Sequence, residues 1–263
     1  MSTPLPQPQL KKKKVFSLKL ARAPPAPMNA HGGLVQLYGY IAARDDVDSK
    51  LNYVFRHGRD DPIAVPLPAR QGSPIEMTGP KRGIVLNCDV LLEFDMRIKN
   101  GDREEDDAQL IDGMTEFYEM HMTGKPSTVR INGDAGGAVD MSLSNVYGFE
   151  ATVEVAISEV GDDAFDFSLG CAVSTMPGVA HKEFQLFGGH VAEPCGLRRF
   201  VVAVSMDTVM HLKLKAVEQN NGVVSNVVER CCSFEAKAHG CASNDVKLDG
   251  LASGSVKVTW SAV

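Results

Sequence analysis

The sequence predicts an all-β protein in which two antiparallel sheets pack face to face as a β-sandwich, with barrel-like closure as an alternative. Three observations lead to this prediction. Short stretches in which apolar and polar residues alternate recur from Val15 almost to the last residue, and turn signals separate them. No segment keeps the 3.6-residue apolar period of an amphipathic helix. The pattern gives about a dozen strands with short connections, as in a sandwich.

The domain organisation is expected to be simple. No break in composition divides the chain after its first residues, so residues 15–263 are expected to form a single β-sandwich domain. Residues 1–14 are expected to form a disordered arm, because they are rich in proline and end in the mutually repelling run Lys11–Lys14. The lysine run is interpreted as a solvated tail, and a nuclear-import signal or a membrane-surface patch is the alternative.

In the first half of the chain, the clearest strand signal lies at residues 90–99. Apolar residues at even positions from Val90 to Ile98 alternate with Leu91 and charged residues, so one side of the strand is apolar and the other mostly charged. This strand is expected to be half-buried and to pair with a second copy of the chain if it lies at a sheet edge. Glu104–Asp107 is expected to be a solvated loop. The other strands predicted here are residues 15–20, 34–44 and 52–55.

The second half continues the same pattern. Asn-Gly pairs at residues 100–101, 132–133 and 221–222 predict hairpins, since this dipeptide adopts the positive backbone angles of tight turns. The remaining predicted strands are residues 116–122, 139–147, 149–160, 166–175, 184–187, 197–206, 210–218, 227–234 and 255–261.

Composition argues against several classes of function. The formal net charge is −6, and an acidic chain does not attract nucleic acid. The chain has no 18-residue apolar stretch, no secretory signal and six scattered cysteines, so we expect a reducing compartment, the cytoplasm or the nucleus, and no membrane. It also lacks a Gly-x-Ser-x-Gly nucleophile elbow. We therefore expect no catalytic residue and lean against an enzyme.

Three motifs that suggest a cofactor or a metal have simpler interpretations. Asn132–Gly137 is rich in glycine but lacks the lysine of a phosphate-binding loop, and Thr78–Gly83 fits ordinary turn chemistry. Cys231 and Cys232 are adjacent in a predicted strand and point to opposite faces, so they do not share one zinc ion. The sequence thus predicts no cofactor-binding residue and no metal ligand, and the expected partner is an unidentified protein or small molecule.

A cluster of mixed charges near strand ends is the strongest candidate for a site. Loops at strand ends commonly carry function, whereas the competing interpretation is that these charges form salt bridges that hold the turns. The cluster comprises Arg44, Asp45, Arg59, Asp60, Asp61, Lys81 and Arg82.

Several motifs, taken together and in order, resemble an uncharacterised domain family that is expanded in grasses. This family occurs alone and also fused to ribosome-inactivating domains of the cereal jasmonate-induced type. The resemblance covers about Val15 to Ser261 and rests on the motifs at residues 38–45, 52–55, 59–61, 78–84, 93–99, 149–155, 197–204 and 256–261.

The resemblance implies a plant protein linked to stress or defence, and no established activity. We expect a non-enzymatic binding module whose working surface is its loops and an acidic sheet face. The alternative is a translation inhibitor, either an rRNA N-glycosidase or a cap-binding protein. The glycosidase needs a helix that carries Glu and Arg, but Phe234–Ala238 has lysine in place of the arginine. Cap recognition stacks a base between aromatic rings, and the only tryptophan, Trp260, is expected in the core.

Overall fold

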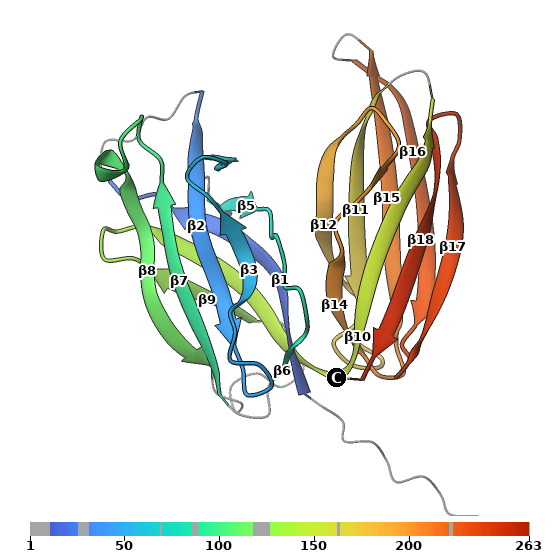
Figure 1. Cartoon of the computed structure of the whole chain (residues 1–263), viewed down its shortest axis with the longest axis horizontal. Coiled ribbons are helices and arrows are strands. Elements are labelled where there is room, and N and C mark those ends of the chain that lie inside the picture. The colour runs from blue at the N-terminus through green and yellow to red at the C-terminus, as the bar shows by residue number, and fades with distance from the viewer. Residues whose placement is uncertain are drawn as a thin grey trace, which may run out of the picture. The chain divides into compact units, whose positions relative to one another are not determined.

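The structure is a computed structural model that describes residues 11–25, 32–68, 70–85, 89–117, 127–161, 164–220 and 223–262. The all-β prediction is confirmed, because the described residues form antiparallel sheets and their only helical element is the short 3-10 turn η1 (Glu104–Asp106) (Figure 1). None of the described segments is a helix with the length and apolar character needed to span a bilayer. The chain forms two compact units, with breaks between residues 12 and 13 and between residues 145 and 146.

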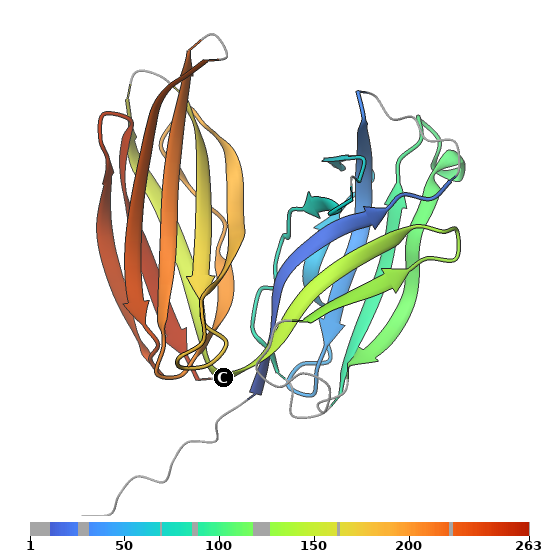
Figure 2. The same cartoon turned by 180° about the vertical axis from the view of Figure 1, so that it is seen from behind.

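The N-terminal unit (residues 13–145) is a sandwich of two sheets. One sheet has the strand order β3-β2-β7-β8, with β4 also paired to β2. In the other, the first part of β10 pairs with β1 and β9, while β5 and β6 pair with β1 (Figure 2). The bounds are β1 Lys11–Arg22, β2 Leu34–Arg44, β3 Asn52–His57, β4 Ile63–Pro66, β5 Ser73–Ile75, β6 Ile84–Val85, β7 Val90–Ile98, β8 Ala108–Phe117, β9 Ser127–Asn132 and β10 Ala138–Val160.

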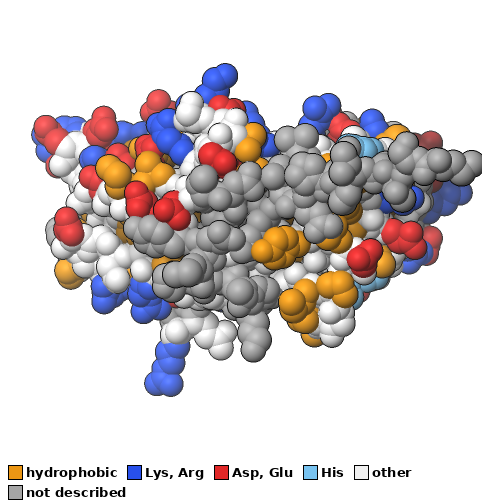
Figure 3. Space-filling model, turned by 90° about the horizontal axis from the view of Figure 1, so that it is seen from below, with side chains coloured by type: hydrophobic (Ala, Val, Ile, Leu, Met, Phe, Trp, Pro, Cys, Tyr) orange, Lys and Arg blue, Asp and Glu red, His pale blue; other side chains and the backbone are white. Residues whose placement is uncertain are grey.

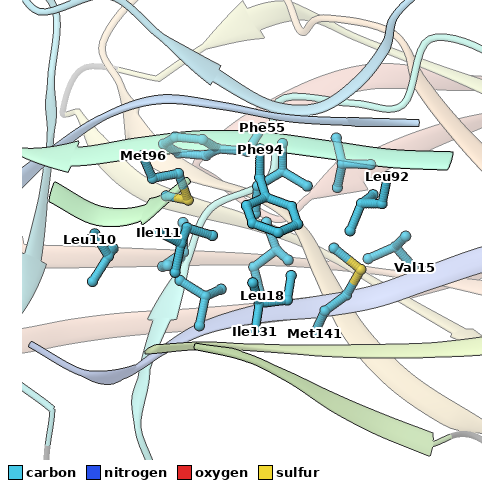
Figure 4. Close-up of a cluster of buried hydrophobic side chains, with 14 of the residues drawn as sticks. Val15, Leu18, Phe55, Leu92, Phe94, Met96, Leu110, Ile111, Ile131 and Met141 are labelled. Atoms are coloured by element: carbon cyan, nitrogen blue, oxygen red, sulfur yellow. The ribbon is translucent and has the colours of Figure 1, made fainter. Parts of the chain in front are cut away.

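The core of this unit lies between its two sheets. The apolar residues at even positions of β7 point inward and are buried, which confirms the alternation seen in the sequence. Side chains from the two layers face each other across the core (Figure 4), among them Phe55, Phe94 and Met96 from one sheet and Leu18, Ile131 and Met141 from the other.

The C-terminal unit (residues 146–263) has the same architecture. Its first sheet has the order β17-β18-β10, with β13 and β14 paired to the other edge of β10, and its second has the order β12-β11-β15-β16. Trp260 is buried, with 4% of its surface exposed, as expected of a core residue. The bounds are β11 Phe165–Val173, β12 Lys182–Val191, β13 Cys195–Gly196, β14 Phe200–Ser205, β15 Val209–Asn220, β16 Val223–Glu235, β17 Gly240–Leu248 and β18 Ala252–Ser261.

A single long strand belongs to both units. β10 runs without interruption over 23 residues, where the sequence predicted two strands, 139–147 and 149–160. The strand continues through Gly148, which pairs with Ser205 of β14, and glycine is required there because a Cβ atom would lie 1.8 Å from the Val204 carbonyl oxygen. A single domain over residues 15–263 stays a prediction, because two compact units that share a strand are compatible with one or with two cooperative folding units.

The structure differs from several predicted boundaries. β1 begins at Lys11, so the lysine run is part of a strand, and residues 1–10 lie outside the described residues. Residues 90–99 do not lie at a sheet edge, because β7 lies between β2 and β8, so the condition for pairing with a second copy through this strand is not met. Most of the strand predicted at 116–122, and the Asn221-Gly222 turn, also lie outside the described residues. The Asn-Gly hairpin at 132–133 is confirmed by the pairing of β9 with β10.

Candidate functional site

The charged turn cluster does not form one site. Arg82 donates hydrogen bonds to both oxygens of Asp45, at 2.6 Å and 2.9 Å, and the backbone N–H of Val85 donates a third at 2.9 Å. Only 1% of the Asp45 side chain is exposed. Burial alone would raise the pKa of Asp45, but the bonds from Arg82 and Val85 outweigh it and hold this pKa below its usual value. This ion pair holds the turn after β2 against the segment before β6.

Arg59 belongs to a second, separate network. Its Nε donates to Asp107 Oδ2 at 2.7 Å, and the Tyr38 hydroxyl and the Asn100 backbone N–H donate to the same carboxylate at 2.7 Å and 2.8 Å. The Asp107 side chain is 0% exposed, so its assignment to a solvated loop is wrong, although Glu104–Asp106 are exposed as expected. These bonds outweigh burial and lower the pKa of Asp107.

The rest of the predicted cluster is dispersed. Arg44 pairs with Glu93 on β7, and the backbone N–H of Lys81 donates to the side chain of Asn52. Asp60 is exposed, and Asp61 lies 3.6 Å from the His57 ring with its carboxylate in solvent. The geometry therefore favours the interpretation in which these charges hold turns. The surface visible in Figure 3 likewise shows acidic and basic side chains side by side.

A different set of residues comes together on the outer side of the sheet β3-β2-β7-β8. Directly paired residues of antiparallel strands point to the same side of a sheet. Arg56, Tyr40, Asp95 and Asp112 form one row across the four strands, and Tyr53, Ala42, Glu93 and Met114 form the next. We call the surface made by these two rows the tyrosine–arginine face.

A β-bulge in β3 builds this face. Tyr53 and Arg56 are three positions apart, so in a regular strand their side chains would point to opposite sides. The register between β2 and β3 shifts by one residue beside Val54, which turns both side chains to the same side. The Val54 carbonyl accepts bonds from the backbone N–H groups of Thr78 and Gly79, at 3.0 Å and 3.1 Å. The Thr78 hydroxyl accepts the N–H of Arg56 at 2.9 Å.

The centre of the face is aromatic and cationic. The Tyr40 and Tyr53 rings meet edge to face, with centroids 5.9 Å apart and planes at 87°. The Arg56 guanidinium carbon lies 4.6 Å from the centroid of the Tyr53 ring, a cation–π contact, and the residue is exposed. Burial, then the charges of Glu93 and Asp95, raise the pKa of Tyr40, so its phenol stays neutral at physiological pH.

Around this centre lie an apolar side chain and internal ion pairs. Met114 is 70% exposed and lies opposite Glu93. Glu93 is paired with Arg44, and Asp95 lies 3.3 Å from Arg97. The described part of the face holds no serine, cysteine or histidine, and its charged groups are carboxylates and one guanidinium.

The other motifs singled out in the sequence have structural roles. In the Asn132–Gly137 hairpin, a Cβ at Gly133 would lie 2.1 Å from the Leu110 carbonyl oxygen, so glycine permits close packing there. Cys231 is exposed and Cys232 is buried, which confirms that they point to opposite faces. Buried Trp260 is not available to stack on a base. Within the described residues, no three or more His, Cys, Asp or Glu side chains are grouped to hold a metal ion.

Comparisons with known proteins give a family but no activity. A family model described as a domain of unknown function (DUF6598) matches residues 14–259. No curated protein matches the chain.

Two solved structures show similarity at low scores. Human GIVD cytosolic phospholipase A2 matches with a TM-score of 0.28 and 9% identity, over 96% of this chain and 32% of that one. This chain thus spans about a third of that protein's length. A pair of domains from Extended-Synaptotagmin 2 matches with a TM-score of 0.31 and 8% identity, over 100% of this chain and 94% of that one. At these scores neither similarity bears on function.

Proposed function

We propose that this chain, which belongs to the family described as domain of unknown function (DUF6598), is a non-enzymatic module that binds a partner protein through its tyrosine–arginine face. The observation that carries the proposal is that Tyr53 and Arg56, which are in contact on β3, and Met114, three strands away on β8, are directed to the same side of one sheet. Aromatic residues, Met and Arg are enriched at protein–protein interfaces, and Tyr and Arg dominate their binding energy.

The arrangement also lowers the entropic cost of binding. The bulge and its bonds to Thr78 fix the backbone at Arg56, and the contact between the Arg56 guanidinium and the Tyr53 ring restricts both side chains before a partner arrives, so less conformational freedom is lost on association. Glu93 and Asp95 pair with Arg44 and Arg97, which lie in the rows next to the face, and these ion pairs provide a polar rim. A partner that places a carboxylate over Arg56 and an apolar side chain against Met114 would match this pattern.

The biological setting forms part of the same proposal. The motifs that resemble the grass-expanded family include Tyr40, Tyr53, Glu93 and Asp95, which all lie on the face. From this resemblance we propose a role for the module in a plant stress or defence response. The cytoplasm is the proposed location, with the nucleus as the alternative, and the free thiols of the described cysteines fit a reducing compartment.

Site-specific photo-crosslinking tests the proposal. A photo-reactive amino acid at position 114 should capture a discrete protein from extracts of stressed cereal leaves, and the same group at position 224, exposed on the other unit, should not. Tyr53→Ala and Arg56→Ala should each remove the product from position 114. A product that persists in both variants, or that also forms at position 224, would rule out this face as the binding surface.

A second experiment separates this proposal from a ribosome-directed enzyme. The purified chain is incubated with ribosomes, and the rRNA is assayed for a depurinated adenine. The non-enzymatic proposal requires the rRNA to remain intact, whereas depurination by the pure chain would overturn it.

A further inference from the structure

Two histidines meet on the outer side of the sheet β12-β11-β15-β16. His211 belongs to β15, and His181 directly precedes β12. Their rings are in contact, with centroids 4.8 Å apart and planes at 61°. Both side chains are at least partly open to solvent, so the pair is accessible.

A neighbouring strand orients one of these rings. His211 is paired directly with Ser233 of β16, and its Nδ1 lies 2.8 Å from the Ser233 hydroxyl oxygen. When Nδ1 carries the proton and donates it to Ser233, the lone pair of Nε2 is left available. A hydrogen bond from the non-ligating nitrogen commonly fixes the tautomer and the orientation of a metal-binding imidazole.

We propose that His181 and His211 form a two-imidazole site for a divalent first-row transition ion, best filled by Cu²⁺ and also by Zn²⁺. With metal–nitrogen bonds of about 2.0–2.1 Å, two imidazoles that share one ion place their centroids about 4.5–5 Å apart. The observed separation of 4.8 Å lies in that range. Imidazole suits both ions, and Cu²⁺ stands above Zn²⁺ in the usual order of affinity.

The surroundings are compatible with a bound cation. Partial burial, then the charges of His181 and Lys213, lower the pKa of His211 and favour the neutral form that ligates metals. Lys213 is the nearest fixed positive charge along β15, and it forms an ion pair with Glu183 of β12, which offsets its repulsion. Since no third ligand joins the pair among the described side chains, the other coordination positions are left to water.

Copper titration of the intact chain tests the site. Calorimetry should show one equivalent of Cu²⁺ bound, and the electron paramagnetic resonance spectrum should show coupling to two imidazole nitrogens. His181→Ala and His211→Ala should each weaken binding about tenfold or more, because the chelating second ligand is lost, and should leave coupling to one nitrogen.

Two variants on the same sheet serve as controls. His190→Ala removes an exposed histidine that bonds to Asp166, and Cys231→Ser removes an exposed thiol on β16. Both should keep the affinity and the two-nitrogen spectrum. Binding that is unchanged in His211→Ala, or abolished by either control substitution, would overturn the proposal. Fluorescence of the buried Trp260 in each variant checks that the unit is still folded.

Discussion

Asp45 is almost completely enclosed by protein, and an arginine 37 positions away neutralises it. Loss of any one of its partners should lower the free energy of unfolding, because a buried charge without partners is costly. Asp107 has the same design, with Arg59 lying 48 positions away along the chain. These two carboxylates therefore join distant turns of the N-terminal unit.

Asp45→Asn should destabilise the protein by about 2–4 kcal/mol, because it leaves the Arg82 guanidinium without its counter-charge. Urea unfolding followed by circular dichroism measures the change. Asp46→Asn is the matched control, since Asp46 is adjacent and exposed, and it should alter the stability by less than about 0.5 kcal/mol. Equal effects of the two substitutions would contradict a structural role for the Asp45–Arg82 pair.

The stability should also depend on pH in a defined direction. The folded-state pKa of Asp45 lies below its unfolded value of about 3.9, so its contribution is complete above that value and is lost as the pH falls through the folded pKa. The free energy of unfolding should therefore fall below about pH 4, and the difference between the wild type and Asp45→Asn should narrow. A constant difference between them down to about pH 2 would argue against this linkage.

The same residues show why the sequence analysis did not identify the ion-pair network of Asp107. Asp107 ends a run of four acidic residues, a pattern that is typical of a solvated loop, and its partners Arg59 and Tyr38 are remote in sequence. Local pattern carries no information about such pairings. The alternative that the charged turn residues form salt bridges was available from the sequence, but the identity of each pair was not.

At the scale of single strands, alternation predicted the burial of β7 and failed to predict its neighbours. The inward and outward residues of Val90–Ile98 follow the sequence pattern. β8 was missed because Asp112, Gly113 and Met114 are all exposed, which breaks the alternation, and without β8 an edge position for β7 stayed open. β17 was missed for a similar reason, since most of Gly240–Leu248 is exposed.

The tyrosine–arginine face was missed because the alternation of apolar and polar residues does not predict where a β-bulge occurs. Tyr53 and Arg56 share a side only because the register shifts beside Val54, and the bonds that hold the shift come from Thr78 and Gly79. In the sequence, Thr78–Gly83 was interpreted as ordinary turn chemistry, and nothing linked it to β3.

The continuity of β10 leads to a prediction about Gly148. Gly148→Ala should destabilise the protein by about 1–3 kcal/mol, because the new Cβ would meet the Val204 carbonyl at 1.8 Å and force β14 away. Gly196→Ala is the control, since no heavy atom lies within 4 Å of a Cβ built there. Thermal unfolding of both variants measures the difference. A Gly148→Ala protein as stable as the control would show that this close approach is unimportant.

At the scale of the whole molecule, the sequence predicted the class of fold correctly, and a single domain stays a prediction. Alternation tells which side of a strand is buried, yet it does not tell which sheet the strand joins. The sequence pattern therefore predicted strands without assigning them to sheets. The described strands form one two-sheet sandwich before residue 146 and another after residue 145.

Whether the two units unfold together can be measured with the only tryptophan. Trp260 lies in the C-terminal unit and Asp45 in the N-terminal unit. We expect Asp45→Asn to move the unfolding midpoint reported by Trp260 fluorescence to lower urea, in step with circular dichroism, because β10 is shared. A Trp260 transition unchanged by Asp45→Asn would mean that the units unfold independently and that the single-domain prediction is wrong.

The shared strand also limits how genes encoding this family can recombine. A breakpoint between the codons for residues 145 and 146 would separate the half of β10 that pairs with β9 from the half that pairs with β14 and β18. Each product would keep its own half of β10 together with the strands paired to that half, so neither half would lose its hydrogen-bonded neighbours. A junction at residues 145 and 146 should therefore be tolerated better than one within residues 138–143 or 148–160, where it would divide a paired segment.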